Sequence, residues 1–334
     1  MLLPEIVASY GMLAVILYAV LGGADFGGGV WDLFASGPRH SQQREVVARA
    51  MGPVWEANHI WLIFVIVILF TCFPTAFYVL CLSLFVPFHL VLLGITLRGA
   101  AFVYRGPHAS DKLTSYWSYI FGMASVMTPF FLGMTMGAVA TGRIRWENEE
   151  VKIVGGIPYL SPLAFSLGFF ALALCAYMAA IFLTKETTGE LQEDFRKRAI
   201  LSGTSVVVFT VLTPPLIYLE ARELWFDLHT ARALPAVVAG GLAMLLSGLF
   251  LFRKQYNLAR LSAAAQIVFL LLGWGLAQYP YLIRPDIQLK DAATEESTLM
   301  FVAVTVPIGL LVLIPSLVLL FRVFKEDTFQ ADEG

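Results

Sequence analysis

The stretch that decides the fold covers residues 57–97 and reads ANHIWLIFVIVILFTCFPTAFYVLCLSLFVPFHLVLLGITL. These 41 residues include no Asp, Glu, Lys or Arg. As a single helix, at ~1.5 Å rise per residue, the stretch would be roughly 60 Å long, about twice the ~30 Å hydrocarbon core of a bilayer. It therefore predicts two membrane-spanning helices joined by a short turn, which we place at Cys72-Phe73-Pro74-Thr75.

The rest of the chain has the same character. Charged residues make up only 14% of the sequence, whereas soluble domains carry roughly 25%. The net charge is −2 and no basic stripe is interleaved with aromatic residues, which excludes a nucleic-acid partner. Charge-free runs long enough to cross a membrane lie at 6–24, 57–97 (two spans), 113–142, 153–184, 199–219, 233–252, 261–283 and 297–321. We expect an all-α, polytopic membrane protein with nine transmembrane helices in a single integral membrane domain, residues 1–334, built as two four-helix bundles plus one peripheral helix.

Nine spans place the two termini on opposite sides of the membrane. The loops of one side, together with the C-terminus, carry 15 Lys and Arg residues, and those of the other side carry 7. The positive-inside rule assigns the richer side to the cytoplasm. The N-terminus is therefore expected in the periplasm and the C-terminus in the cytoplasm. No basic residue precedes the first apolar run, so we expect a retained span and no cleaved signal peptide.

Three ionisable residues fall within the apolar spans at a similar predicted depth, one to two turns from the cytoplasmic surface. They are Asp25, Glu56 and Arg98. The first three spans are sequential and expected to be adjacent, so the three side chains can form a cluster. Charges inside a membrane usually line a path for a proton, an ion or a substrate. The alternative is that they are interfacial charges that extend to water, which suits the long side chain of Arg98 better than the short one of Asp25.

Three further residues accompany Glu56 on its helix. His59 shares its helix face one turn deeper, Asn58 adds an amide, and Trp55 can pack over the cluster. The candidate proton path therefore consists of Glu56, Asp25, His59, Asn58 and Arg98. We expect no catalytic residue and no metal site in this chain.

Other features have simpler interpretations. Gly23-x-x-x-Gly27 and Gly133-x-x-x-Gly137 are small-xxx-small patterns that predict close helix packing. The glycine-rich segment 22–29 lacks G-K-[ST] and a preceding soluble strand, so a nucleotide-binding loop is excluded. Its glycines are expected to allow close helix contact or an irregular helix end. His89, in the middle of the third span, could ligate haem, although a hydrogen-bonded core histidine is the simpler interpretation.

At these residues the chain resembles a known family. The segment 22–27, GGADFG, with Trp31-Asp32-Leu33, is similar to the first-helix signature of subunit II of cytochrome bd-type quinol oxidases. The segment 52–62, GPVWEANHIWL, resembles the second-helix motif of that family. Residues 97–99, LRG, resemble its third-helix ending, and residues 278–281, QYPY, resemble a segment at the end of helix 8. The resemblance covers nearly the whole chain, and the compact length looks like that of the cyanide-insensitive branch.

The resemblance implies a complex of the bacterial cytoplasmic (inner) membrane that oxidises quinol and reduces O₂ to water. Subunit I, a homologous partner of nine helices, would carry the quinol site and the haems, which are b and d, or b only. The resemblance also implies that Glu56 belongs to a path for protons from the cytoplasm, although many relatives carry Asp there. A structural quinone in this chain, a small single-span subunit and membrane lipids are the further partners that it allows.

Two other functions remain open at this point. A proton-coupled secondary transporter would show paired discontinuous helices in two repeats, with polar residues near the midplane. A purely structural partner subunit would use Asp25, Glu56 and Arg98 only to bind one another.

Overall fold

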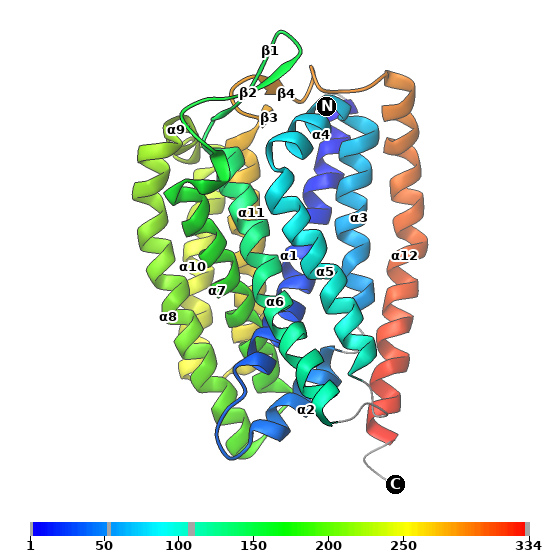
Figure 1. Ribbon diagram of the computed structural model, residues 1–334, viewed down its shortest axis with the longest axis vertical. Coiled ribbons are helices and arrows are strands. Elements are labelled where there is room, and N and C mark those ends of the chain that lie inside the picture. Colours follow the sequence, from blue (N-terminus) through cyan, green and yellow to red (C-terminus); the bar gives the residue numbers. More distant parts are fainter. Residues whose placement is uncertain (1–2, 52–54, 106–110, 331–334) are drawn as a thin grey trace.

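Long helices aligned along one axis form a bundle, and short elements lie at both of its ends (Figure 1). The computed structural model describes residues 3–51, 55–105 and 111–330. The long helices of these ranges are α1 (Leu3–Leu33), α3 (Trp55–Cys72), α5 (Phe85–Tyr104), α6 (Asp111–Ala140), α7 (Pro162–Lys185), α8 (Gly189–Glu220), α10 (Leu234–Phe252), α11 (Tyr256–Gln278) and α12 (Glu296–Gln330). The short elements are α2 (His40–Met51), α4 (Pro74–Ser83), α9 (Arg222–Leu228), the 3₁₀ turn η1 (Pro158–Leu160) and the strands β1 (Ile144–Glu147), β2 (Glu150–Ile153), β3 (Tyr281–Ile283) and β4 (Ile287–Gln288).

The number of spans agrees with the sequence. Within the described ranges, eight helices are each long and apolar enough to cross a membrane, and the bent pair α3–α4 raises the number to nine. The start of α1 and the end of α12 lie at opposite ends of the bundle (Figure 1), as an odd number of spans requires. The prediction of a helical, nine-span membrane fold is confirmed. The side that faces the cytoplasm and the grouping into two four-helix bundles plus a peripheral helix remain predictions.

The charge-free stretch forms three helices, where the sequence predicts two. α3 ends at Cys72, α4 begins at Pro74, and the two axes differ by 118°. Pro74 explains the break, because proline has no N–H to donate and fits best in the first turn of a helix. The Cys72 carbonyl instead accepts a hydrogen bond from the Thr294 N–H at 2.9 Å. The predicted turn is therefore confirmed, but the next long helix begins only at Phe85, and α4 is an element that the pattern does not predict.

Several other boundaries differ from the charge-free runs. α1 continues past Asp25 to Leu33, so the glycine-rich segment is regular helix and not an irregular helix end. α8 begins ten residues before the predicted start at 199, and α2 occupies a piece that reads as a hydrophilic loop. α7 begins nine residues after the predicted start at 153, because β2 ends at Ile153 and the residues after it form a turn and η1. The absence of charge marks the apolar part of a helix, whereas its ends are set by turn residues and backbone hydrogen bonds.

Glycines bring the central helices into close contact. A Cβ on Gly27 of α1 would overlap the carbonyl oxygen of Cys175 on α7. A Cβ on Gly133 of α6 would overlap the Leu167 carbonyl of α7, and one on Gly137 would lie 2.5 Å from the Ala164 Cα. The close packing predicted from the glycine spacing is therefore confirmed for α1, α6 and α7.

Polar contacts fasten the short elements at both ends of the bundle. At the end that holds the start of α1, Asp286 accepts hydrogen bonds from the Arg145 Nε at 2.7 Å and from the Trp146 N–H at 2.9 Å, which joins the two hairpins. This contact raises the pKa of Arg145. At the opposite end, the Arg39 guanidinium donates to both carboxylate oxygens of Asp194 at 2.8 Å, which raises the pKa of Arg39. This contact fixes the segment between α1 and α2 against α8.

Candidate functional site

Asp25 of α1 and Arg98 of α5 form a buried ion pair. Two guanidinium nitrogens of Arg98 donate to the two carboxylate oxygens at 2.5 and 2.6 Å, and Nη2 also donates to the Asp25 carbonyl oxygen at 3.1 Å. Each residue is only 1% exposed. A planar, bidentate pair of this kind is the strong form of ion pair, with the two side chains fixed relative to each other. The structure brings these two residues together as the sequence predicts, while their role remains a prediction.

Helix α6 completes the surroundings of Arg98. The Arg98 Nε donates to the Ser125 Oγ at 3.0 Å, and this hydroxyl donates to the Phe121 carbonyl at 2.7 Å. The rings of Phe26 and Phe121 have their centroids 4.8 and 4.9 Å from the Arg98 Cζ. The guanidinium is therefore enclosed by its counter-ion, a hydroxyl and two aromatic faces. The alternative that Arg98 extends to water is wrong, because its charged group is buried against Asp25.

The predicted α3 residues lie next to this pair. The Asn58 side chain donates to the Leu21 carbonyl of α1 at 3.4 Å. The His59 ring lies 6.3 Å from the Phe26 ring and 6.4 Å from the Tyr18 ring, measured between centroids. Tyr18 is a further site residue that the motifs do not single out.

Two polar atoms at this α1–α3 contact are buried. The Tyr18 hydroxyl and the Asn58 Oδ1 have no hydrogen-bond partner among the residues that the structure describes. Buried polar atoms are normally satisfied, and ordered water is a frequent partner. The α1–α3 contact therefore has the capacity to bind water beside the ion pair.

The third member of the predicted cluster is Glu56. Its side chain and that of Trp55 lie outside the described residues, so the proximity of Glu56 to Asp25 remains a prediction. The backbone of both residues forms the first turn of α3. That turn follows α2, at the end of the bundle where α1 ends (Figure 1).

A second ion pair joins the end of α1 to the residue that follows α5. The Arg105 Nη1 donates to the Asp32 Oδ2 at 3.1 Å, and the two side chains are 11% and 3% exposed. The Arg105 Cζ lies 3.9 Å from the centroid of the Phe121 ring, the ring that also contacts Arg98. The motifs do not reveal this pair, but the spacing could have. Asp32 follows Asp25 by seven residues and Arg105 follows Arg98 by seven, which is about two helical turns in each case.

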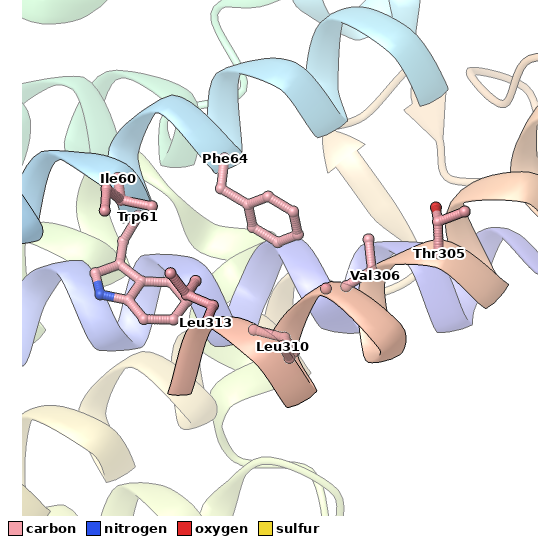
Figure 2. A pocket seen from close by; sticks show the side chains of 8 residues that line it. Ile60, Trp61, Phe64, Thr305, Val306, Leu310 and Leu313 are labelled. Carbon is pink, nitrogen blue, oxygen red and sulfur yellow. The ribbon is translucent and has the colours of Figure 1, made fainter. Parts of the chain in front are cut away.

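An apolar cleft lies between α3 and α12 (Figure 2). Its volume is about 280 Å³. It is lined by Ile60, Trp61, Phe64, Thr305, Val306, Gly309, Leu310 and Leu313. The lining offers hydrocarbon surface with few polar groups, which suits a hydrocarbon chain better than a polar ligand.

Comparison with known proteins agrees with this architecture. The sequence profile of the family described as cytochrome bd terminal oxidase subunit II matches residues 3–324. A protein of Bacillus subtilis (strain 168), provisionally named a cytochrome bd menaquinol oxidase subunit II, is 23% identical over 326 residues, which is 94% of this chain and 93% of that protein. The cytochrome bd-I ubiquinol oxidase subunit 2 of Escherichia coli (strain K12) is 23% identical over 197 residues, 58% of this chain and 52% of that protein. A chain of the bd oxidase structure from Geobacillus thermodenitrificans has the same fold, with a TM-score of 0.81 at 23% identity over 97% of this chain and 99% of that chain.

The helical bundle defines a multi-pass membrane protein, and two buried ion pairs lie among its helices. The chain belongs to the cytochrome bd terminal oxidase subunit II family. It is therefore a subunit of a respiratory quinol oxidase, a complex that contains haem and a partner subunit. This membership favours the oxidase over the proton-coupled transporter among the functions that the sequence leaves open.

Neither histidine of the described spans is arranged as a haem ligand within this chain. An axial ligand must face a cavity between helices. The His89 ring lies against the Phe85 ring at 3.9 Å, with its Nδ1 2.7 Å from the Phe85 carbonyl oxygen. His89 is exposed on the outer surface of α5. The expectation that it is a core histidine is therefore wrong, whereas the expected hydrogen bond is present. His59 is packed near two aromatic rings, and no group of three His, Cys, Asp or Glu side chains in the described ranges could hold a metal ion.

Proposed function

We propose that this chain is the haem-free subunit of the oxidase, which supports a haem-bearing subunit I and supplies a path for protons from the cytoplasm. In this proposal the complex lies in the bacterial cytoplasmic membrane, and the end of the bundle that carries α2 faces the cytoplasm. The observation that supports it is the polar section between α1, α3 and α5, which lies toward that end of an otherwise apolar bundle. The haems, b and d or b only, are assigned to subunit I.

For O₂ reduction, the polar residues between α1, α3 and α5 would have to support a hydrated path for protons. Reduction of O₂ consumes protons, and an unsolvated proton in a hydrocarbon core is prohibitively costly. The Asp25–Arg98 pair is neutral as a unit, so it supplies a fixed field without a net charge. The buried Tyr18 hydroxyl and Asn58 carbonyl oxygen can bind water on the face of α3 that also carries His59. In our proposal Glu56 takes up the proton in the first turn of α3 and these residues line the next step.

The α3–α12 cleft supports a second part of the proposal. Its apolar lining and its open position at the edge of the bundle suit the isoprenoid chain of a structural quinone or a lipid acyl chain (Figure 2). A small single-span subunit is a further partner that the helical surface can accommodate.

Glu56→Gln tests the proton path. The amide is nearly the same size as the carboxyl but cannot carry a proton, so quinol-dependent O₂ uptake by the purified complex should fall by roughly tenfold or more. The reduced-minus-oxidised optical spectrum should stay unchanged, because no haem depends on this residue. Glu56→Asp is the matched control and should keep most of the turnover. Unchanged turnover in the Gln variant would favour the purely structural subunit instead.

A further inference from the structure

The two carboxylates of α1 are held very differently. Asp25 uses both oxygens to accept short hydrogen bonds from Arg98, whose other nitrogen is bound to Ser125. Asp32 accepts one hydrogen bond from the side chains in the described ranges, from Arg105 at 3.1 Å. A carboxylate with both oxygens engaged by a fixed guanidinium exchanges protons poorly, whereas one held by a single long bond can release its partner at small cost.

Asp25 and Asp32 also differ in how close they lie to the end of α1. Asp32 is the second-last residue of α1, and Arg105 follows directly after the end of α5. Phe34, two residues after Asp32, is 59% exposed. Asp25 lies seven residues further into the helix, roughly 10 Å along its axis. Asp32 is therefore the α1 carboxylate nearest to the aqueous phase at this end.

Positive charge surrounds Asp32 on more than one side. Arg105 and, from α2, Arg44 act on it electrostatically, and Arg98 acts on Arg105 in turn. The Phe121 ring contacts both guanidinium groups, with its centroid 3.9 Å from the Arg105 Cζ and 4.9 Å from the Arg98 Cζ. The contact with Phe121 holds Arg105 near Asp32, and Arg105 donates only one hydrogen bond to the Asp32 carboxylate.

We propose that Asp32 is the outermost proton-exchanging carboxylate of the path, with Arg105 as its positioning residue and the Asp25–Arg98 pair as a fixed neutral dipole. This inference rests on the proposed function. A proton from bulk water binds to the Asp32 carboxylate, and the neutral acid no longer holds Arg105 by charge. The proton then leaves to water on the inner side, and the regenerated carboxylate pairs with Arg105 again. No other bond forms or breaks. A chain of water molecules must carry the proton from Asp32 to the residues of α3.

The test uses the complete oxidase complex with Asp32→Asn, and measures proton uptake with a pH-indicator dye while the reduced enzyme reacts with O₂. We expect uptake to be about tenfold slower than in the parent complex, with an unchanged haem spectrum. Asp32→Glu, which keeps the carboxyl group, should restore uptake to within about twofold. Because Asp32→Asn leaves Arg105 without its counter-ion, the double variant Asp32→Asn/Arg105→Gln removes both charges and should take up protons as slowly as the single variant.

The outcomes separate this inference from the proposed function. Slow uptake in both neutral variants, with rescue by Glu, supports a proton-exchanging Asp32. Parent-like uptake in the double variant overturns the inference, because a role limited to pairing with Arg105 would vanish with both charges. If Glu56→Gln is slow in the same assay, the proton path still stands without Asp32. If Glu56→Gln is also parent-like, the proposed function fails together with the inference.

Discussion

Arg98→Leu should largely abolish the assembled complex. The substitution leaves the Asp25 carboxylate buried, 1% exposed, without the guanidinium that donates to both of its oxygens. Breaking a buried ion pair from one side costs about 3–5 kcal/mol, because the remaining charge has no partner. The Ser125 hydroxyl also loses its contact with the Nε. The measurement is the yield of haem-containing complex purified in mild detergent through a tag on this chain, together with its Tm.

Two variants serve as controls for this prediction. Arg98→Lys keeps the positive charge but not the planar, bidentate geometry, so it should give an intermediate yield. The double variant Asp25→Asn/Arg98→Leu leaves no lone charge and should be more stable than Arg98→Leu alone. A yield and Tm of Arg98→Leu equal to those of the parent would mean that the ion pair does not hold α1 and α5 together.

Much of this site follows from the sequence because charges are rare in an apolar chain. The absence of charge over 57–97 predicts two membrane spans, and the alternating direction of the spans then gives the depth of each charged residue. That reasoning places Asp25 and Arg98 at the same depth, and the structure shows them in contact. The identity of the family follows from short motifs of the first two spans, which surround the same charges.

The parts of the site and fold that the sequence does not predict depend on contacts between helices, which the sequence of a single helix does not reveal. Asp32 and Arg105 lie just beyond the charge-free runs, where a charge ordinarily means an exposed helix end. Only the packing of both helices against Phe121 of α6 shows that they are buried and paired. The sequence does not predict α4 for another reason. A helix break at Pro74 can be predicted from the proline, but the 118° change of direction depends on the residues that pack around it.

Gly27→Val should prevent assembly as severely as the loss of Arg98. A Cβ at this position would overlap the backbone carbonyl of Cys175 on α7, and the Ala179 Cβ lies close by at 2.7 Å. Backbone atoms within a helix cannot turn aside as a side chain can, so α1 and α7 must separate. Overpacking in a close-packed core costs about 1–3 kcal/mol when side chains can adjust, and more when they cannot. The expected result is little or no haem-containing complex, measured by the same purification and spectrum.

Gly248→Val on α10 is the matched control, since nothing lies within 4 Å of a Cβ placed there, and it should leave the yield of complex close to that of the parent. Gly27→Ala should lie between the two, because it introduces the overlapping Cβ without the branches. Gly27 stands two residues after Asp25 on α1, and Gly29 of the same helix faces Ser125. A displaced α1 would therefore also pull Asp25 away from Arg98, so the loss of packing and the loss of the ion pair should add to each other. Normal assembly of Gly27→Val would show instead that α1 and α7 can separate without disturbing the site.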